Sequence, residues 1–407
     1  MSGNREAEVV IVGAGPVGAA LACALGGAGI PVALADRTPP QGARAADGRA
    51  YAIAAGARVL LESAGVWRHL PAPPQPILDI LVTNGRPDRR GAGGWLHFDS
   101  REMATTDDPS APGGAFGWML PAPALAAALA ARLAELPQVA VLAPAEVRPV
   151  RVGNVVRVTL NGGAELPCRL LVAADGRNSA IRRAAAIPVT RLSYGQSALV
   201  FRIGHDRPHH GVAAEHFVPT GPFAQLPLPA TEAEAHVSAM VWSVPGREAA
   251  ALASLPGAAL AVAVAQRLGG RLGAVRLLDR PQVYPLSAHY AARYTAERLA
   301  LAGDAAHSMH PVAGQGLNLG LRDVALLAEL VAGAAARGED VGSPELLARY
   351  QRGRRADGLK LLAVTDVLVR LFGVNFPPLD LARSLGLRAV AHIPPLRRLF
   401  MREAMGG

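Results

Sequence analysis

The sequence is poor in cysteine, in aromatic side chains and in lysine. Cys23 and Cys168 are the only cysteines among 407 residues, and each lies within an apolar run. Two isolated cysteines provide neither a disulfide framework nor a metal-binding motif, so we expect inert core residues at both positions. Lys360 is the only lysine. Its late position excludes a catalytic lysine anywhere before residue 360.

Long apolar runs are absent as well. Although 51% of the residues are apolar, the longest candidate segments, 121–131 and 255–265, reach only about half of the roughly 20 residues that a membrane-spanning helix needs. Residues 1–6 lead directly into a strand-like run and leave no room for the apolar part of a signal peptide. The sequence therefore predicts a folded, cytoplasmic chain of two or three packed units without a membrane span.

Positive charge is concentrated near the end of the chain. Residues 349–407 contain ten Arg and one Lys against four acidic residues, which accounts for +7 of the net charge of +9. A nucleic-acid surface would interleave basic and aromatic residues, and aromatic residues make up only 4% of this chain. We therefore predict no nucleic-acid partner.

The N-terminal segment predicts a strand, a glycine-rich turn and a helix. Residues 8–12 are almost all apolar, as expected for a strand buried on both faces, and a helical run follows to about residue 28. The G-x-G-x-x-G pattern between them permits a tight turn, close approach of a pyrophosphate and packing of the helix on the sheet. The residues that we assign to a dinucleotide here are Gly13, Ala14, Gly15 and Gly18.

A second apolar strand, at 30–35, ends at Asp36 and is followed by Arg37. An acidic residue at this position accepts hydrogen bonds from ribose hydroxyl groups in dinucleotide-binding folds. We assign Asp36 and Arg37 to the cofactor. This segment leaves NAD and FAD as open alternatives, because both use the same cradle.

Two further segments place an acidic turn after an apolar strand. Residues 168–183 predict a buried strand, a turn at Asp175 and the start of a helix. Residues 298–318 predict another buried strand, which ends at Gly303 and Asp304 before a glycine-rich turn and a long helix. No second G-x-G-x-x-G follows a strand, so a nicotinamide reductant has no domain of its own and is expected to bind transiently.

Together, the three motifs resemble those of the group A flavoprotein monooxygenases with the para-hydroxybenzoate hydroxylase fold. Within that group the sequence is most similar to the ubiquinone-biosynthesis hydroxylases of the UbiH, UbiF and VisC type, over essentially the whole chain. The most specific segment is 310–323. Other segments that carry the resemblance are 47–50 with Ala52, 221–222, 226–228, 241–242, 305–307 and 365–366. Residues 121–123 are apolar where relatives commonly have polar residues, so we assign no flavin contact there.

The resemblance implies a non-covalently bound FAD and gives roles to the third motif. Asp304 is expected to bind the ribityl chain, because a carboxylate accepts hydrogen bonds from hydroxyl groups without further help. Pro311 is expected to lie against the flavin face, with Gly314 and Gln315 in the active-site loop. A helix of about fifteen residues from Leu317 would point its N-terminal amides at the flavin ring. The other residues that we assign to the cofactor here are Gly303, Gly316 and Asn318.

Charged and histidine residues near these motifs have competing interpretations. Arg49 lies in a segment that in relatives reaches toward the flavin, where a guanidinium pairs with a pyrophosphate; the alternative is a solvated surface arginine. Asp175 is expected to hold Arg49 or a water on the pyrophosphate, and to line the groove that the nicotinamide cofactor visits. His307 and His310 have a spacing that metal ligands use, but no third ligand is suitably spaced, so we predict hydrogen bonding and no metal.

Tyr194, Phe217 and Trp242 are candidates for lining a substrate pocket. Aromatic residues on strands are as often plain core, so both interpretations remain open. These residues lie within 190–285, where short alternating runs predict an antiparallel sheet. The strands expected there are 197–203, 236–244 and 275–283.

The predicted fold class is α/β, with a Rossmann-like FAD-binding domain that is discontinuous in sequence, an antiparallel-sheet substrate domain and a C-terminal helical region. The FAD-binding domain is assigned to residues 1–71, 100–185 and 286–345, the substrate domain to residues 72–99 and 186–285, and the helical region to residues 346–407.

The resemblance implies an enzyme that uses O₂ and NAD(P)H to hydroxylate an aromatic ring, with a polyprenylated phenol of ubiquinone biosynthesis as the expected substrate. The alternatives are a hydroxylase of a soluble aromatic compound, a non-catalytic FAD-binding scaffold of the biosynthetic complex, and a prenyl reductase that uses no oxygen. A flavin halogenase is excluded, because the early lysine and the Trp-x-Trp motif that it needs are missing.

A prenylated substrate would bring the enzyme to the inner face of a membrane or to a complex, through residues 349–407. In the final helix, one basic arc and one apolar arc are expected, a pattern that suits anionic headgroups. The alternative is that the apolar arc packs on the FAD-binding domain. The basic arc holds Arg397, Arg398 and Arg402 together with Met401, and the apolar arc holds Leu396, Leu399 and Phe400.

Overall fold

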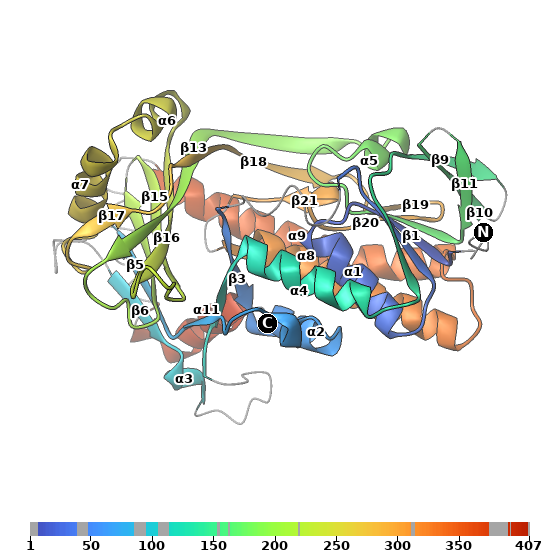
Figure 1. The fold of residues 1–407 in the computed structure, drawn as a ribbon, viewed down its shortest axis with the longest axis horizontal. Coiled ribbons are helices and arrows are strands. Elements are labelled where there is room, and N and C mark those ends of the chain that lie inside the picture. The colour runs from blue at the N-terminus through green and yellow to red at the C-terminus, as the bar shows by residue number, and fades with distance from the viewer. Residues whose placement is uncertain are drawn as a thin grey trace.

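The computed structural model describes residues 7–38, 48–84, 95–104, 114–152, 155–161, 163–218, 220–310, 314–373, 390 and 392–405. The molecule is elongated, with a sheet at each end (Figure 1). Two long strands, β13 (Val189–His205) and β18 (Gln282–Ala291), run along one side between the two ends. Helices fill the space beneath them.

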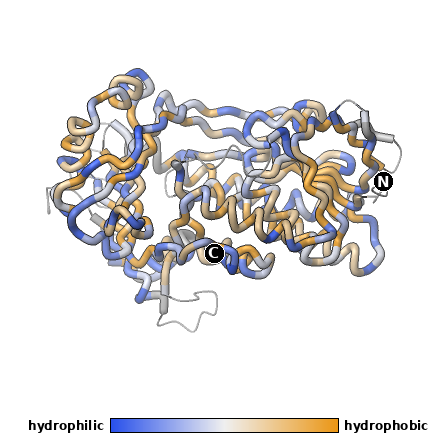
Figure 2. Tube along the Cα trace, viewed as in Figure 1, coloured by the Kyte–Doolittle hydropathy of each residue, from blue (hydrophilic) through white to orange (hydrophobic). Residues whose placement is uncertain are grey.

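The sheet near the N-terminus, called the N-terminal sheet below, is mainly parallel. Its strands are buried runs of Val, Ile, Leu and Ala, as expected for parallel strands covered on both faces, and they appear as orange segments in Figure 2. The described strands follow the order β19 (Thr295–Ala296), β20 (Leu299–Leu301), β12 (Leu170–Ala173), β1 (Val9–Val12), β2 (Val32–Ala35) and β8 (Val139–Leu142). Cys23 and Cys168 are both buried thiols beside this sheet, as predicted.

Long helices pack side by side on this sheet. Helix α1 (Pro16–Gly27) contacts α4 (Ala122–Ala134) and α8 (Gln315–Ala336), and α8 contacts α9 (Pro344–Gly373). Helix α8 has 22 residues, so the predicted start at Leu317 and the predicted length were wrong. The reason is Gly314, which adopts a left-handed conformation with φ of 64° and begins the helix at the next residue.

The sheet at the other end, called the large sheet below, is mostly antiparallel, as predicted. β14 and β5 form a parallel pair within it. The expected strand at 275–283 was wrong: residues 278–281 separate two strands that pair with different parts of β13. The described strands follow the order β21 (His307–Ser308), β18, β13, β16 (Val237–Pro245), β15 (Gly221–Leu228), β14 (Val212–Val218), β5 (Asp79–Asn84) and β6 (Trp95–Asp99), with β17 (Val275–Leu277) beside β13.

Smaller elements complete the fold, and the mixture of sheets and helices confirms the predicted α/β class. A small sheet joins β3 (Ala50–Ala54), β7 (Gly117–Pro121) and β4 (Gln75–Ile77), and a meander joins β9 (Val147–Val152), β10 (Val155–Leu160) and β11 (Ala164–Cys168). The remaining helices are α2 (Ala55–Ser63), η1 (Trp67–His69), α3 (Arg101–Ala104), α5 (Ala180–Ala184), α6 (Gly246–Ala253), α7 (Gly257–Arg267), η2 (Gly303–Ala305) and α11 (Pro394–Met405).

The large sheet has a different apolar core on each face. On one face, Phe223 and Trp242 pack beneath α6 and α7. On the other face, Ala213 and Ala239 pack against the small sheet, in one cluster with Met119. The second face is therefore the one that looks toward the nucleotide motifs.

Helix α11 does not present the basic arc predicted for it, whereas the side chains of Leu396 and Leu399 in the predicted apolar arc lie outside the described residues. Arg397 donates to both carboxylate oxygens of Glu102, at 2.7 and 2.6 Å, and its guanidinium lies over the Phe98 ring. Met401 is 1% exposed and Phe400 is 41% exposed. The predicted common basic arc was wrong, because the Arg397 pair and the apolar environment of Met401 turn that side of the helix inward.

Candidate functional site

The first and third nucleotide motifs meet at Val17, in the first turn of α1. A Cβ atom at Gly303 would lie 2.9 Å from Val17 Cγ2, and one at Gly320 would lie 2.7 Å from it. The first and second motifs meet at Gly13, where a Cβ atom would lie 2.3 Å from the Ala174 carbonyl oxygen. The turns after β1, β12 and β20 thus converge at the carboxyl edge of the N-terminal sheet, where nucleotides bind in folds of this kind.

The glycines of these turns fall into two groups. Gly18 serves packing, because a Cβ atom there would lie 1.9 Å from the Gly13 carbonyl oxygen. A Cβ atom at Gly15 or Gly316 would meet no described atom within 4 Å. These two residues lie at the N-terminal ends of α1 and α8, where helix dipoles and backbone N–H groups attract anions. An open space at two helix N-termini fits a phosphate-bearing ligand.

Asp36 shapes the first turn. Its Oδ2 accepts the Ala14 N–H at 2.6 Å, and its Oδ1 accepts the Thr38 N–H at 2.9 Å. Oδ1 also accepts the Thr38 hydroxyl group at 3.0 Å, so the carboxylate holds the turn from both sides. The Ala14 N–H is already donated to Asp36, which means that Ala14 shapes the loop. Arg37 is exposed.

The backbone of the Asp304 turn is held by side chains from three elements. Asp323 of α8 accepts the Gly303 N–H at 2.9 Å. His289 of β18 donates from Nε2 to the Asp304 carbonyl oxygen at 2.9 Å. Arg182 of α5 donates to the next carbonyl oxygen at 2.8 Å. Buried side chains thus fix the turn, and the Asp304 carboxylate is left to project from it.

Asp304 is an exposed residue, and yet its carboxyl group is shielded from bulk water. Desolvation raises its pKa, against the opposing influence of Arg177, His307 and Arg49. This combination is expected for a group that faces an enclosed space rather than bulk water. Such a position suits the predicted contact with the ribityl chain.

Arg49 lies beside the third motif, because its charge acts on Asp304. Its guanidinium carbon is 5.9 Å from the centre of the Tyr51 ring and 6.0 Å from that of the Tyr284 ring. A position near Asp304 favours the cofactor-binding interpretation over an isolated surface arginine. The side chain also lines a hollow of about 520 Å³ between the small sheet and β13, with Gly48, Pro121, Pro123, Val200, Phe201, Arg202, Asp279, Arg280, Pro281 and Gln282.

One oxygen of the Asp175 carboxylate is engaged by the backbone of α5. Its Oδ2 accepts the backbone N–H groups of Ala180 and Ile181, at 2.7 and 3.3 Å, at the start of α5. No hydrogen bond to Arg49 is present among the described residues. The other carboxylate oxygen, Oδ1, is buried and has no hydrogen-bond partner there. Because Asp175 follows Ala174 at the cofactor cradle, this oxygen is available to a bound group.

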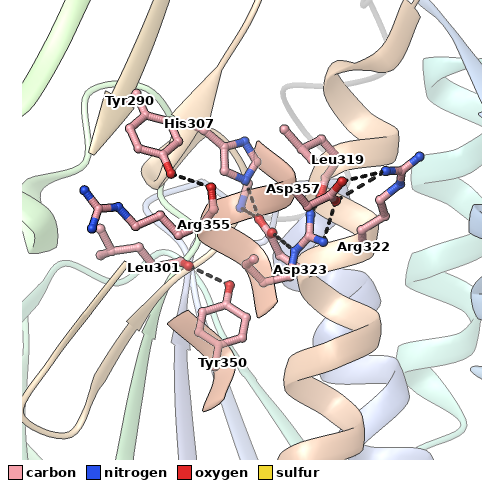
Figure 3. A network of polar contacts seen from close by, with 11 residues as sticks. Tyr290, Leu301, His307, Leu319, Arg322, Asp323, Tyr350, Arg355 and Asp357 are labelled. Atoms are coloured by element: carbon pink, nitrogen blue, oxygen red, sulfur yellow. Dashed lines mark hydrogen bonds and ion pairs between the residues drawn. The ribbon is translucent and has the colours of Figure 1, made fainter. Parts of the chain in front are cut away.

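A buried ionic network under the Asp304 turn was not predicted from the sequence (Figure 3). Asp323 is fully buried and accepts from His307 Nε2 and from Arg354 Nε, each at 2.7 Å. Burial opposes its ionisation, but the contacts with His307 and Arg354 outweigh burial and hold the pKa of Asp323 below its ordinary value. Arg322 of α8 also donates to Asp357 of α9 at 3.2 Å, so two ion pairs tie α9 to α8 and to the cofactor turn.

The network extends to the N-terminal sheet through α9. Tyr350 donates to the Leu301 carbonyl oxygen at 2.8 Å, and Tyr290 of β18 donates to the Arg355 carbonyl oxygen at 2.8 Å. The only sequence signal for this network is a single acidic residue on the apolar side of a helix. Pattern analysis does not reveal its partner, which lies on another helix.

The N-terminus of α8 is joined to the small sheet. Asn318 donates to the Ala52 carbonyl oxygen at 2.9 Å and accepts the Ala54 N–H at 3.0 Å. Its side-chain amide thus joins the start of α8 to β3. Gly314 precedes the first turn of α8, and Gln315 is the first residue of that helix. Pro311 lies outside the described residues.

The predicted pocket residues are not brought together. Tyr194 lies at a bulge in β13 and makes an edge contact with His310, with ring centres 5.0 Å apart, next to the active-site loop. Phe217 is buried on β14, on the face of the large sheet toward the small sheet. Trp242 is on the opposite face, beneath Arg267 and against Phe223. Trp242 belongs to the core under α7, because its position on β16 faces away from the motifs.

No group of three or more His, Cys, Asp or Glu residues within the described ranges is arranged to hold a metal ion. His307 instead hydrogen-bonds Asp323. None of the helices described is both long and apolar enough to cross a membrane.

Comparisons with known proteins agree with this site. Residues 6–365 match the model of a family described as an FAD binding domain. The chain is 44% identical over 408 residues to the ubiquinone hydroxylase UbiL of Rhodospirillum rubrum, covering 100% of this chain and 91% of that protein. It is 32% identical over 412 residues to the 3-demethoxyubiquinol 3-hydroxylase of Escherichia coli, covering 99% of both.

Solved structures share the fold at lower identity. The p-nitrophenol 4-monooxygenase PnpA of Pseudomonas putida superposes with a TM-score of 0.77 at 21% identity, covering 99% of this chain and 98% of that one. PqsL of Pseudomonas aeruginosa in complex with 2-aminobenzoylacetate gives a TM-score of 0.77 at 24% identity, covering 94% and 99%. These similarities support the arrangement of sheets and helices described above.

Proposed function

The chain belongs to the FAD-dependent monooxygenase family that includes the ubiquinone hydroxylases, and on this basis we propose that it hydroxylates the ring of a polyprenylated phenol in ubiquinone biosynthesis. The observation that carries the proposal is the full-length similarity to two such hydroxylases, in a chain whose three nucleotide motifs converge on one site. The overall reaction inserts one atom of O₂ into the ring, reduces the other to water and oxidises NAD(P)H.

The cofactor is FAD, and the residues at the site fit it. Bound there, it supplies the transfer of electrons from NAD(P)H and the activation of O₂. The open spaces at Gly15 and Gly316 and the buried, unpaired Oδ1 of Asp175 are positions that a bound group would fill. We assign the pyrophosphate to the Gly13–Gly15 turn and α1, and the ribityl hydroxyl groups to Asp304.

The N-terminus of α8 and Arg49 give the site a positive potential. We assign the backbone N–H groups that begin at Gln315 to the pyrimidine edge of the flavin, where negative charge accumulates on reduction. Arg49 neutralises part of the charge of Asp304 and of the pyrophosphate. These groups favour the reduced, negatively charged cofactor.

A reconstitution assay tests the reaction. The purified protein, loaded with FAD, receives NAD(P)H, isotopically labelled O₂ and a phenol that carries a farnesyl chain beside its hydroxyl group. We expect a product with one labelled oxygen atom. We also expect faster NAD(P)H oxidation in the presence of the phenol, because an enzyme without a fixed reductant domain avoids wasteful turnover by allowing flavin reduction only when substrate is bound. A product without added oxygen would identify a reductase. Bound FAD without any phenol-stimulated oxidation would identify a scaffold.

The identity of the ring separates two hydroxylase functions. Mass spectrometry of the quinone intermediates that accumulate in a deletion strain reports the natural substrate directly. Accumulation of a prenylated phenol supports the proposal. Normal quinone content, together with turnover of an unprenylated phenol by the purified protein, would favour a hydroxylase of a soluble aromatic compound.

We further propose a peripheral membrane contact through α11, because a polyprenyl chain confines the substrate to a bilayer. Phe400 is 41% exposed and Ile393 is 47% exposed, and Arg398 and Arg402 of α11 are exposed as well. A surface helix that exposes both apolar and basic residues suits an anionic membrane.

Vesicle flotation tests this contact. Binding to anionic vesicles is expected to weaken with salt and with the double change of Arg398 and Arg402 to Gln. Arg397→Gln is the matched control, because Arg397 is engaged by Glu102 and is expected to contribute little. Equal binding to neutral vesicles, or no binding at all, would contradict a membrane role for α11.

A further inference from the structure

A single carboxyl group lies on the large-sheet face that looks toward the small sheet. Glu215 occupies the middle of β14, in an otherwise apolar run broken only by His216. Side chains alternate along a strand, so Glu215 shares its face with Phe217, and His216 points to the opposite face. The strand register places Glu215 beside Ala224 of β15 and Val82 of β5. Its nearest neighbours in the sheet are therefore small or apolar.

This face is connected to the active-site loop. Ala213, two residues before Glu215, packs in one apolar cluster with Met119 of the small sheet, and Ala52 of β3 packs against that cluster. A Cβ atom at Gly314, at the start of α8, would lie 3.2 Å from Ala52 Cβ. The small sheet thus lies between the active-site loop and the face of the large sheet that carries Glu215.

Glu215 has no hydrogen bond or ion pair with any residue that the structure describes. Burial raises its pKa to about 8 and is the sole cause of the shift. Helix α9 packs against β14 and β15, and β5 lies beside β14. None of the ionisable groups on these elements contributes to the shift, including Lys360 and Asp366 on α9, Asp79 on β5 and His216 on the far face.

The side chain nevertheless keeps part of its surface accessible. Buried carboxyl groups in proteins are normally paired or hydrogen-bonded, because an unpaired one costs several kcal/mol or becomes protonated. An accessible, desolvated and unpartnered carboxyl group among apolar side chains is typical of a site that a ligand completes. The apolar surroundings suit an aromatic ring, and the carboxyl group suits one hydroxyl substituent on that ring.

We propose that Glu215 accepts the proton of the phenolic hydroxyl group of the aromatic substrate. This inference rests on the proposed function, which makes the substrate a phenol. The phenolic O–H bond breaks, the proton moves to a Glu215 carboxylate oxygen, and the electron pair stays on the phenol oxygen and delocalises into the ring. The ring becomes a better nucleophile for oxygen transfer, and no further oxidant or reductant is needed for this step. After hydroxylation, the proton returns from Glu215 to the product oxygen.

The acidity of the group fits this step. Phenols ionise with a pKa of about 10, and an ordinary glutamate ionises near 4.3, which is too acidic to compete for the proton. A group with a pKa of about 8 is a stronger base and lies closer to the working pH. The ionised form, which accepts the proton, increases as pH rises through this value.

The test compares Glu215→Gln with His216→Gln. The Gln side chain at 215 keeps the size and polarity but removes the base. His216 lies on the same strand and is also buried, but it bonds Thr83 at 2.7 Å on the opposite face, so its variant controls for damage to β14. The farnesylated phenol is the probe in both measurements. FAD content and melting temperature confirm that each variant is folded.

The first measurement uses no NAD(P)H. Binding of the phenol to the FAD-loaded wild type is expected to produce a weak phenolate absorption band from about 1% of the bound phenol, because the two pKa values differ by about two units, and Glu215→Gln loses this band whereas His216→Gln keeps it. The second measurement is the pH dependence of kcat/KM. It is expected to rise toward about pH 8 in the wild type, and in Glu215→Gln it loses this rise. The value of kcat is expected to fall roughly 100-fold or more, the usual contribution of a general base, with a much smaller change in KM.

A phenolate band and a kcat within threefold of wild type in Glu215→Gln would overturn the role of Glu215. If that variant does not fold, Glu215→Asp, which keeps a carboxyl group, must show a shifted pH profile, and an unchanged profile overturns the role equally. A wild type that forms the phenolate band but no hydroxylated product leaves Glu215 supported and contradicts the proposed function. A wild type that forms product without the band contradicts Glu215 alone.

Discussion

Replacing Asp323 by Asn is expected to weaken both the fold and the cofactor site. Asp323 is fully buried and has three partners: Arg354, His307 and the Gly303 N–H. Breaking a buried ion pair by removing one charge typically costs about 3–5 kcal/mol, because the other charge stays buried without compensation. Asn retains an acceptor, so we expect the lower end, about 3 kcal/mol.

The expected change in melting temperature follows from this free energy. The entropy of unfolding is about 2.1 cal/mol/K per residue, or about 0.85 kcal/mol/K for 407 residues, so Asp323→Asn is expected to lower the melting temperature by about 3–4 °C. Loss of the bond to the Gly303 N–H loosens the turn that carries Asp304. One hydrogen bond contributes about 0.5–1.5 kcal/mol, which corresponds to an FAD affinity weaker by up to about tenfold.

The assay combines thermal unfolding of the apo-protein with FAD titration followed by flavin fluorescence. Glu339→Gln is the matched control, because the Glu339–Arg337 pair is equally close at 2.7 Å, but its side chains are 55% and 54% exposed. Exposed pairs contribute little, so no measurable shift is expected. The double change Asp323→Asn with Arg354→Met is expected to cost less than the sum of the single changes. An Asp323→Asn protein with wild-type melting and wild-type FAD affinity would refute the reasoning.

Three further predictions concern the cofactor turns and pH. Gly15→Ala is expected to weaken FAD binding and to leave the melting temperature of the apo-protein unchanged. Gly18→Ala places a Cβ atom 1.9 Å from the Gly13 carbonyl oxygen and is expected to destabilise the apo-protein itself. Calorimetry of the apo-proteins and FAD titration separate the two effects. Asp304→Ala is expected to weaken FAD binding at least tenfold, since a hydrogen bond to a charged group contributes about 1.5–3 kcal/mol, without lowering the apo-protein melting temperature; retention of stoichiometric FAD after dialysis would argue against the assigned contact. The pKa of Asp323 is lower in the folded than in the unfolded chain, so its stabilising contribution is present above about pH 4 and is lost as pH falls below that value; melting curves of wild type and Asp323→Asn should therefore converge in acid.

Local patterns predicted the nucleotide turns well. The spacing of Gly13, Gly15 and Gly18 between a strand and a helix has a direct physical cause. A Cβ atom would clash with nearby backbone at Gly13 and Gly18, and the space beside Gly15 is open to a ligand. The positions of β1, α1 and β2 follow from periodicity in the same way. These features depend on residues close together in sequence, where pattern analysis is strongest.

Features that depend on partners far apart in sequence were missed or assigned to the wrong side. Asp323 contacts Arg354, which is 31 residues away on another helix. Arg397 contacts Glu102, 295 residues away, and this pair decides which side of α11 faces inward. In the sequence, Glu215 is simply one acidic residue in an apolar strand. Its proposed role depends on which face of the sheet lies toward the small sheet and α8, and the sequence does not give that face. A helical or strand period identifies two faces, but tertiary contacts decide which of them is buried.

The attachment of α9 to the Asp304 turn has a consequence for biosynthesis of the protein. The cradle takes parts from residues near 13, 175 and 304, but the buried charge beneath it is balanced only when Arg354 is in place. A nascent chain that ends before α9 therefore holds Asp323 without its guanidinium partner. We expect a ribosome-bound chain to retain FAD only after α9 has left the exit tunnel, so that cofactor capture is one of the last events of synthesis. In the finished protein, retention of FAD by the chain would then report that its C-terminal helices have docked.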